Sequence, residues 1–208
     1  MELVPKDRLI QTGPFDHADW NYRPLLAFIA RRRFALALSL LPPAPARRLL
    51  EVGFGSGVLM PELAKRCGEL HGIDVHPSVD HVNACLAAQG VSAMLSRQDA
   101  AHTSFPDHFF DAIIAVSALE FIESIEDAAS ELSRILSREG RLITVMPRKS
   151  RLLDAALHLA TGEDAERDYQ GRREHVLPAL LKHFRIARKK SFFPIYTAYE
   201  LRLRIASG

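Results

Sequence analysis

Three closely spaced glycines follow an apolar segment in the first third of the chain. Residues 49–57 read LLEVGFGSG, so Gly53, Gly55 and Gly57 stand at alternate positions. Glycine has no Cβ and adopts positive φ readily, so such a turn lets backbone amides approach a bound molecule closely. Tight turns without a ligand also use glycine. Three glycines between an apolar strand and a helix nevertheless favour a ligand-binding loop.

An acidic residue lies at the spacing expected for a ribose contact. Asp74 ends the apolar segment 70–75 and follows Gly53 by 21 residues (74 − 53 = 21). In dinucleotide-binding folds an acidic residue about 20 positions on binds the ribose hydroxyls. That spacing fits any ligand that carries adenosine. The structural alternative for Asp74 is a turn or helix N-cap beside Pro77 and Ser78.

The glycine spacing departs from the dinucleotide fingerprint. In G-x-G-x-x-G the third glycine comes three residues after the second, whereas here that position is Val58 and the third glycine is Gly57. No Tyr-x-x-x-Lys pair is recognisable either. An NAD-dependent oxidoreductase is therefore the disfavoured alternative.

Apolar strand patterns and helical patterns alternate around these residues. Polar residues 1–17 are expected to form an extended arm, residues 19–41 a helix that the prolines after Leu41 end, and residues 151–183 a polar, helical stretch. Glu139 and Gly140 are expected to end the helix before the fifth strand. The predicted strands are 48–52, 70–75, 93–95, 110–116, 141–146, 185–192 and 198–205, and the helices of the core are 61–66, 79–89 and 124–136.

This βαβ alternation predicts an α/β fold with a Rossmann-like, doubly wound sheet. The sheet is expected to be mostly parallel, with an antiparallel C-terminal strand and helices on both faces. The chain length suits a single domain, 1–208. Its expected parts are an N-terminal cover helix (14–41), a cofactor-binding core (47–147), a substrate-side insert (148–183) and a C-terminal strand pair (184–208).

Composition narrows the classes of function. The formal charge of +2 lacks the strong basic excess of nucleic-acid binders, so no nucleic-acid partner is expected. The two cysteines form no C-x-x-C pair, and no metal site is expected. No apolar stretch reaches the ~20 residues of a transmembrane helix, and the first residues do not form a signal peptide. We therefore expect a cytoplasmic protein, whose oligomeric state the sequence does not indicate.

Residues 51–57 resemble the E/D-x-G-x-G-x-G motif of class I S-adenosylmethionine-dependent methyltransferases. The likeness continues in order at 72–75, 97–100, 109–122 and 133–142, and covers residues 47–147. It implies S-adenosylmethionine as cofactor, S-adenosylhomocysteine as product, and in-line displacement at the methyl carbon. The implied cofactor-binding residues are Glu51, Gly53, Phe54, Gly55, Ser56, Gly57, Asp74, Val75, Gln98, Asp99, Ala100, Val116 and Ser117.

The resemblance also implies a role for several of these residues. The glycine loop and the following helix N-terminus would meet the amino-acid tail, with Glu51 accepting from its ammonium group. Asp74 would bind the ribose diol, Asp99 the adenine amino group, and Phe54 and Val75 would form apolar walls. A non-catalytic S-adenosylmethionine-binding protein is the other alternative, because binding motifs do not prove turnover.

The acceptor is expected to be a small or lipid-like molecule. Residues 117–120 read SALE where nucleic-acid amino-methylating enzymes of this fold carry [DN]-P-P-[FYW], and this resembles the S-x-L-E of small-molecule and lipid methyltransferases. No general base is singled out. Peripheral membrane contact through Arg31–Arg33 and residues 34–41 is considered, with packing as a cover helix as the alternative. The substrate-side candidates are Trp20, Tyr22, Arg23, Glu120, Phe121, Arg172, Arg173 and His175.

Overall fold

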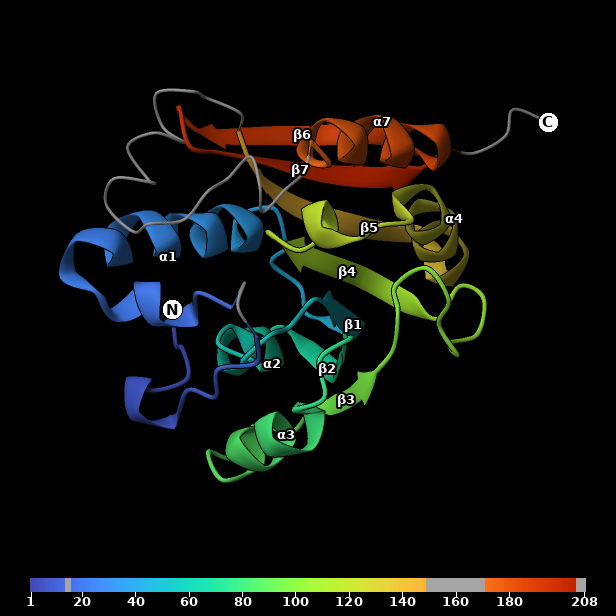
Figure 1. Cartoon of the computed structure of the whole chain (residues 1–208). Helices are drawn as coiled ribbons and strands as arrows, with labels where there is room; N and C mark the ends of the chain where they lie inside the picture. The colour runs from blue at the N-terminus through green and yellow to red at the C-terminus, as the bar shows by residue number, and fades with distance from the viewer. Residues whose placement is uncertain (14–15, 149–170, 205–208) are drawn as a thin grey trace.

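A seven-stranded sheet forms the centre of the structure, a computed structural model that describes residues 1–13, 16–148 and 171–204 (Figure 1). The strand order is β3-β2-β1-β4-β5-β7-β6. Neighbouring strands pair in parallel from β3 to β5, whereas β7 is antiparallel to both β5 and β6. The predicted Rossmann-like sheet with an antiparallel C-terminal strand is thus confirmed. The strands are β1 (Ala46–Val52), β2 (Cys67–Asp74), β3 (Met94–Arg97), β4 (Phe110–Val116), β5 (Leu136–Pro147), β6 (Phe184–Phe192) and β7 (Tyr196–Leu203).

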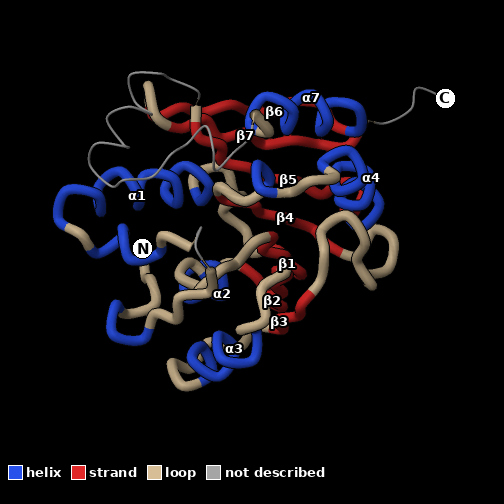
Figure 2. Tube along the Cα trace, viewed as in Figure 1, coloured by secondary structure: helices blue, strands red, loops and turns tan. Residues whose placement is uncertain are grey.

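Helices cover both faces of this sheet (Figure 2). The buried residues of β4 alternate between two apolar clusters: Ile113 packs with α4 and α7, whereas Ile114 packs with α1, α2 and α3. Strands buried on both faces are the reason that residues 110–116 read as a continuous apolar run. The helices are α1 (Pro24–Leu38), α2 (Met60–Ala64), α3 (Val79–Ala87), α4 (Ile125–Ile135) and α7 (Arg173–His183), with short 3₁₀ helices η1 (Lys6–Arg8), η2 (Ala18–Tyr22) and η3 (Leu119–Phe121).

Two predicted boundaries differ from the structure. Helix α1 ends at Leu38, and Leu40 and Leu41 are buried beyond it in the connection to β1. Glu139 and Gly140 do not separate a helix from a strand, since β5 begins at Leu136, directly after α4. The register of β5 against β4 instead shifts between the pairs Phe110–Leu136 and Ala112–Arg141, so residues 137–140 bulge within the strand.

The residues that α1 buries bear on the membrane contact considered for this helix. Phe34 and Leu38 are buried, which makes α1 a cover helix and removes these apolar residues from any membrane contact. Phe28, on the same helix, is 57% exposed. Among the described residues no helix is long and apolar enough to cross a bilayer.

Part of the expected helical stretch 151–183 lies outside the described residues. Its described end forms α7, which packs on α4. Apart from the short helix η1, the described residues of the N-terminal arm form no helix or strand before η2. The division of the chain into cover helix, core, insert and strand pair stays a prediction.

Candidate functional site

A pocket of about 620 Å³ opens at the carboxyl ends of β1, β2 and β4. The strand order reverses beside β1, where the chain continues to β2 on one side and β4 on the other, and ligands of open α/β sheets bind at such a point. Of the thirteen predicted cofactor-binding residues, all but Gly57 line it. They are Glu51, Gly53, Phe54, Gly55, Ser56, Asp74, Val75, Gln98, Asp99, Ala100, Val116 and Ser117.

The glycine turn after β1 has a different constraint at each glycine. All three have positive φ: 72° at Gly53, 52° at Gly55 and 68° at Gly57. A Cβ at Gly53 would lie 2.5 Å from the Cβ of Ala118, and one at Gly57 would lie 3.0 Å from Val82 Cγ1 on α3. Gly57 therefore packs the loop against α3. Only Gly55 has open space at its Cβ position, with the nearest protein atoms, those of Asp16, at 3.6 Å or more.

The carboxylate of Asp74 holds the glycine loop against the end of β2. Its Oδ2 accepts from the Gly55 amide at 2.8 Å, and its Oδ1 accepts from the Val75 amide at 2.7 Å. His76, which the sequence reasoning missed, lies 3.0 Å from the Gly55 carbonyl through Nε2, while its Nδ1 accepts from the Ser78 amide. Because Nδ1 accepts, Nε2 carries the proton and donates to Gly55. Asp74 thus binds the amide of Gly55 and His76 binds its carbonyl, so the backbone of Gly55 is held from both directions.

Three buried oxygen atoms that line the pocket have no hydrogen-bond partner among the described residues. They are Glu51 Oε2, Ser56 Oγ and Ser117 Oγ. Burial raises the pKa of Glu51 to about 8, with a further rise from Asp74 and an opposing effect of Arg33. Buried polar groups in native proteins are normally satisfied, so these oxygens indicate a polar ligand, and Glu51 favours a cationic group in it.

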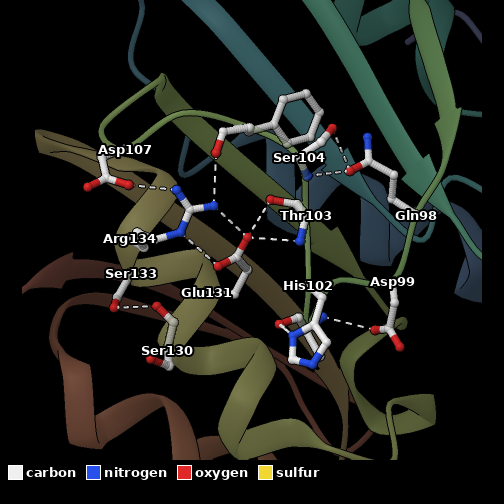
Figure 3. Close-up of polar contacts among 12 residues, drawn as sticks. Gln98, Asp99, His102, Thr103, Ser104, Asp107, Ser130, Glu131, Ser133 and Arg134 are labelled. Carbon is white, nitrogen blue, oxygen red and sulfur yellow. Dashed lines mark hydrogen bonds and ion pairs between the residues drawn. The ribbon is translucent and has the colours of Figure 1, made fainter.

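A polar network on α4 fixes the connection that carries Gln98 and Asp99 (Figure 3). Glu131 accepts from both the amide and the hydroxyl of Thr103 and pairs with Arg134, which lowers its pKa to about 2. Gln98 accepts from the Ser104 amide at 2.7 Å. Asp99 Oδ1 accepts from the Ala101 amide at 2.9 Å. The exposed Asp99 is therefore held at the pocket rim by its own loop.

The N-terminal arm closes one side of the pocket, which no sequence signal predicted. Thr12, Gly13, Asp16, His17 and Ala18 line it. The arm keeps its shape through Asp16, which accepts from the amide and hydroxyl of Thr12 and from the amide of Ala18.

The predicted substrate-side residues of the first helix lie away from this pocket. Trp20 and Arg23 line a separate, smaller cavity of about 480 Å³, and Arg23 forms an ion pair with Asp19. Tyr22 donates its hydroxyl hydrogen to the Val4 carbonyl, which fastens the arm. These contacts suit a structural role, and a role in substrate binding stays a prediction.

The remaining substrate-side candidates lie in different surroundings. Phe121 lines the pocket, whereas His175 is exposed on α7. Glu120 does not start a solvent-facing helix: it is 1% exposed, and neither carboxylate oxygen has a partner among the described residues. Burial raises the pKa of Glu120 to about 7, while Arg33 and Arg173 act to lower it.

One arginine connects this buried carboxyl with the pocket. Arg33 lines the pocket and acts electrostatically on Glu51, Glu120 and Tyr196. Arg172 donates from Nε to the Glu120 carbonyl at 3.2 Å. The sequence showed Arg33 only as part of a basic run, with nothing to separate it from Arg31 and Arg32.

Comparison with known proteins gives matches to the central part of the chain. The family model described as "Methyltransferase domain" matches residues 50–144. Demethylmenaquinone methyltransferase of Tropheryma whipplei (strain Twist) is 29% identical over 109 residues, 51% of this chain and 44% of that protein. Phosphatidylethanolamine N-methyltransferase of Cereibacter sphaeroides is 29% identical over 118 residues, 55% of this chain and 56% of that protein. The chain thus matches about half the length of these relatives.

Solved structures share the fold over most of the chain. A SAM-dependent methyltransferase from Aquifex aeolicus superposes with a TM-score of 0.71 at 17% identity, covering 91% of this chain and all of that one (100%). The N-methyltransferase NodS from Bradyrhizobium japonicum WM9, in complex with S-adenosyl-L-homocysteine, gives a TM-score of 0.66 at 20% identity, covering 94% and 95% of the two chains.

Proposed function

The chain belongs to the class I S-adenosylmethionine-dependent methyltransferases, and from this premise we propose that it transfers a methyl group from S-adenosylmethionine to a small, lipid-like acceptor. The observation that carries the proposal is the set of unpartnered buried oxygens around the glycine turn, with Glu51 at its centre. Residues 50–144 match the methyltransferase family model, and the polar groups that line the pocket suit that cofactor.

The residues of the pocket fit the methyl donor group by group. The α-ammonium group of its amino-acid tail would pair with Glu51, which would otherwise stay buried without a partner. The ribose hydroxyls would bond to Asp74 and the adenine amino group to Asp99. Helix α2 has only five residues, so we assign the tail carboxylate mainly to the amides of the glycine loop, with Ser56 and Ser117 as further hydroxyl partners.

Methyl transfer from S-adenosylmethionine requires little acid–base chemistry from the protein at the methyl donor. When bound, S-adenosylmethionine supplies a methyl group on a sulfonium sulfur, which leaves as a neutral thioether without needing an acid. The pocket residues contribute by orientation, and alignment alone is worth up to ~7–11 kcal/mol in favourable cases. The arm residues Thr12, Gly13 and Asp16 would exclude water from the donor side.

We assign the acceptor to the end of the pocket near Arg33 and Phe121. Two relatives are named for demethylmenaquinone and phosphatidylethanolamine, and both names describe lipid-like acceptors. Glu120 does not itself line the pocket, but it adjoins Phe121 and is electrostatically coupled to Arg33, both of which do. An unpartnered buried carboxyl with a pKa of about 7 suits a base that takes the proton of a hydroxyl or ammonium acceptor.

Replacing Asp74 is expected to weaken cofactor binding. Asp74→Ala removes both the proposed ribose contact and the acceptor of the Gly55 amide, so the Kd for S-adenosylhomocysteine should rise about 10- to 100-fold. Isothermal titration calorimetry measures it. Asp80→Ala, on the exposed side of α3, is the control and should bind as the wild type does. An unchanged Kd for Asp74→Ala would exclude the residue from the site.

Replacing Glu120 separates acceptor chemistry from cofactor binding. Wild-type kcat/KM should rise with pH through about 7, as Glu120 becomes a carboxylate. Glu120→Gln should remove this limb of the pH profile and lower kcat about 10²- to 10⁴-fold, with the Kd for S-adenosylhomocysteine within about twofold. A structural role alone would leave the pH limb in place, so a retained limb would contradict the assignment.

A methyl-transfer screen tests the proposed function. The protein is incubated with S-adenosylmethionine labelled in the methyl group, together with separate lipid and water-soluble fractions of a cell extract. We expect label in one product of the lipid fraction. Tight binding of S-adenosylhomocysteine without transfer to either fraction would support the non-catalytic alternative instead.

A further inference from the structure

Two exposed phenylalanines lie on adjoining elements, outside the residues that line the pocket. Phe28 on α1 is 57% exposed, and Phe193, in the turn between β6 and β7, is 76% exposed. The ring of Phe28 contacts that of Phe192 edge to face, with centroids 5.9 Å apart, so helix and turn adjoin here. Single exposed apolar residues are ordinary, but neighbouring exposed phenylalanines indicate an interaction surface.

Arginine side chains lie over these rings. The guanidinium carbon of Arg32 is 4.5 Å from the ring centroid of Phe28 and 5.5 Å from that of Phe192. Arg148 lies 5.3 Å from the centroid of Phe193. We call Phe28, Arg32, Arg148, Phe192 and Phe193 the aromatic–arginine patch. Within it each of the two exposed phenylalanine rings has an arginine beside it.

The elements that form the patch carry positive charge only. Neither α1 (24–38) nor the hairpin segment 184–199 contains an aspartate or glutamate. On the edge strand β6, the exposed Lys190 donates to Ser39 directly after α1 and adds a further cation beside the helix. Glu200, the next acidic residue in β7, is buried and paired with Arg188, so it does not neutralise the surface. The partner must therefore be anionic as well as apolar.

The same helix links the patch to the pocket. Arg33 and Phe34 of α1 line the pocket, while Phe28 and Arg32 are exposed on the helix. The exposed Phe193 lies in a hairpin turn, where a side chain projects from the surface and can enter a fluid layer without a matching cavity. Both features favour a lipid surface over a shaped protein partner.

We propose that the aromatic–arginine patch docks on the surface of an anionic lipid bilayer. Phe28 and Phe193 enter at the boundary of headgroups and acyl chains, and Arg32 and Arg148 meet the lipid phosphates. This contact does not use the apolar residues Phe34, Leu38, Leu40 and Leu41, which are buried. It does not depend on methyl transfer, so its test stands apart from that of the proposed function.

Vesicle co-sedimentation of the full chain tests this docking. We expect binding to vesicles of 70% phosphatidylcholine and 30% phosphatidylglycerol, little binding to pure phosphatidylcholine, and a decrease at 0.5 M NaCl. The double variant Phe28→Ser/Phe193→Ser should lower the partition coefficient at least tenfold, and Arg32→Ser about fivefold. Controls are Met94→Ser, since Met94 is 50% exposed on β3 at the opposite edge of the sheet, and Arg138→Ser; both should bind like the wild type.

Three outcomes would overturn the proposal. One is equal binding to neutral and anionic vesicles. Another is wild-type binding by the double variant, whose thermal unfolding is compared with that of the wild type to confirm its fold. The third is sedimentation velocity that shows dimers, abolished by Phe193→Ser, in a protein that does not bind vesicles. That last result would assign the patch to a second copy of the chain.

Discussion

Gly55→Val is expected to abolish S-adenosylhomocysteine binding, raising Kd more than 100-fold, while the protein stays folded. A Cβ at Gly55 meets no protein atom closer than 3.6 Å, so the backbone site accepts a β-carbon in ordinary contact with the Asp16 side chain, and the methyl groups of valine extend beyond that carbon. The valine side chain would project between Gly55 and Asp16, which both line the pocket, and so fill space assigned to the ligand. Calorimetry measures the loss.

In Gly55→Val, the effect of backbone strain must be separated from the effect of a side chain that obstructs the ligand site. The φ of 52° at Gly55 makes any L side chain unfavourable by ~1–2 kcal/mol, so a loss of stability is expected as well. Gly90→Val is the matched control, because Gly90 has a φ of 73°, has no neighbour within 4 Å of its Cβ position, and lies outside the pocket. Both variants should unfold at lower temperature, but only Gly55→Val should lose binding. Normal binding by Gly55→Val would place the ligand elsewhere.

Glu51→Gln should stabilise the ligand-free protein and weaken cofactor binding. The folded-state pKa of Glu51 is about 8, above the ordinary value of 4.5, so the folded state holds this proton more tightly than the unfolded state. The charged form therefore destabilises the fold increasingly as pH rises from about 4.5 to 8. Glutamine removes this cost, so Tm should rise by at least roughly 2 °C at pH 8, with a smaller difference towards pH 5.

The same substitution removes the partner assigned to the ammonium group. Loss of a hydrogen bond to a charged group, ~1.5–3 kcal/mol, corresponds to a Kd for S-adenosylhomocysteine that is about 10- to 100-fold higher. In the wild type at pH 7, binding should release roughly 0.5–1 proton as Glu51 ionises, seen as a binding enthalpy that differs between phosphate and Tris. Glu120→Gln, which replaces another buried and unpartnered carboxyl outside the pocket lining, should retain both affinity and proton release. Identical proton release by Glu51→Gln and wild type would contradict this role.

Much of the sheet was predictable because its strands are short, apolar and separated by clear breakers. Residues 110–116 were predicted at their observed limits, since a strand buried on both faces reads as one apolar run. The end of α1 was not, because Leu40 and Leu41 continue the apolar pattern after the helical hydrogen bonds have ended. The bulge at 137–140 was missed since Glu139–Gly140 reads equally well as a helix end.

Some residues of the candidate site were likewise predictable from the sequence, and others were not. Residues of the glycine turn and the ends of β2 and β4 were predictable because they lie next to the strands in sequence. Arg33 and the arm residues around Asp16 reach the pocket through tertiary packing, for which local sequence carries no signal. His76 was missed although it follows the end of β2 by two residues. Glu120 was predicted as a substrate-side residue, but its burial could not be predicted, because it follows from how η3 packs against β5 and α7.

Calorimetric titration of the purified chain with S-adenosylhomocysteine and, in parallel, with NADH tests the central claim most directly. The account predicts one-site binding of S-adenosylhomocysteine, lost in Gly55→Val and kept in Gly90→Val, with no heat of binding from NADH. Saturable NADH binding together with no response to S-adenosylhomocysteine would contradict it.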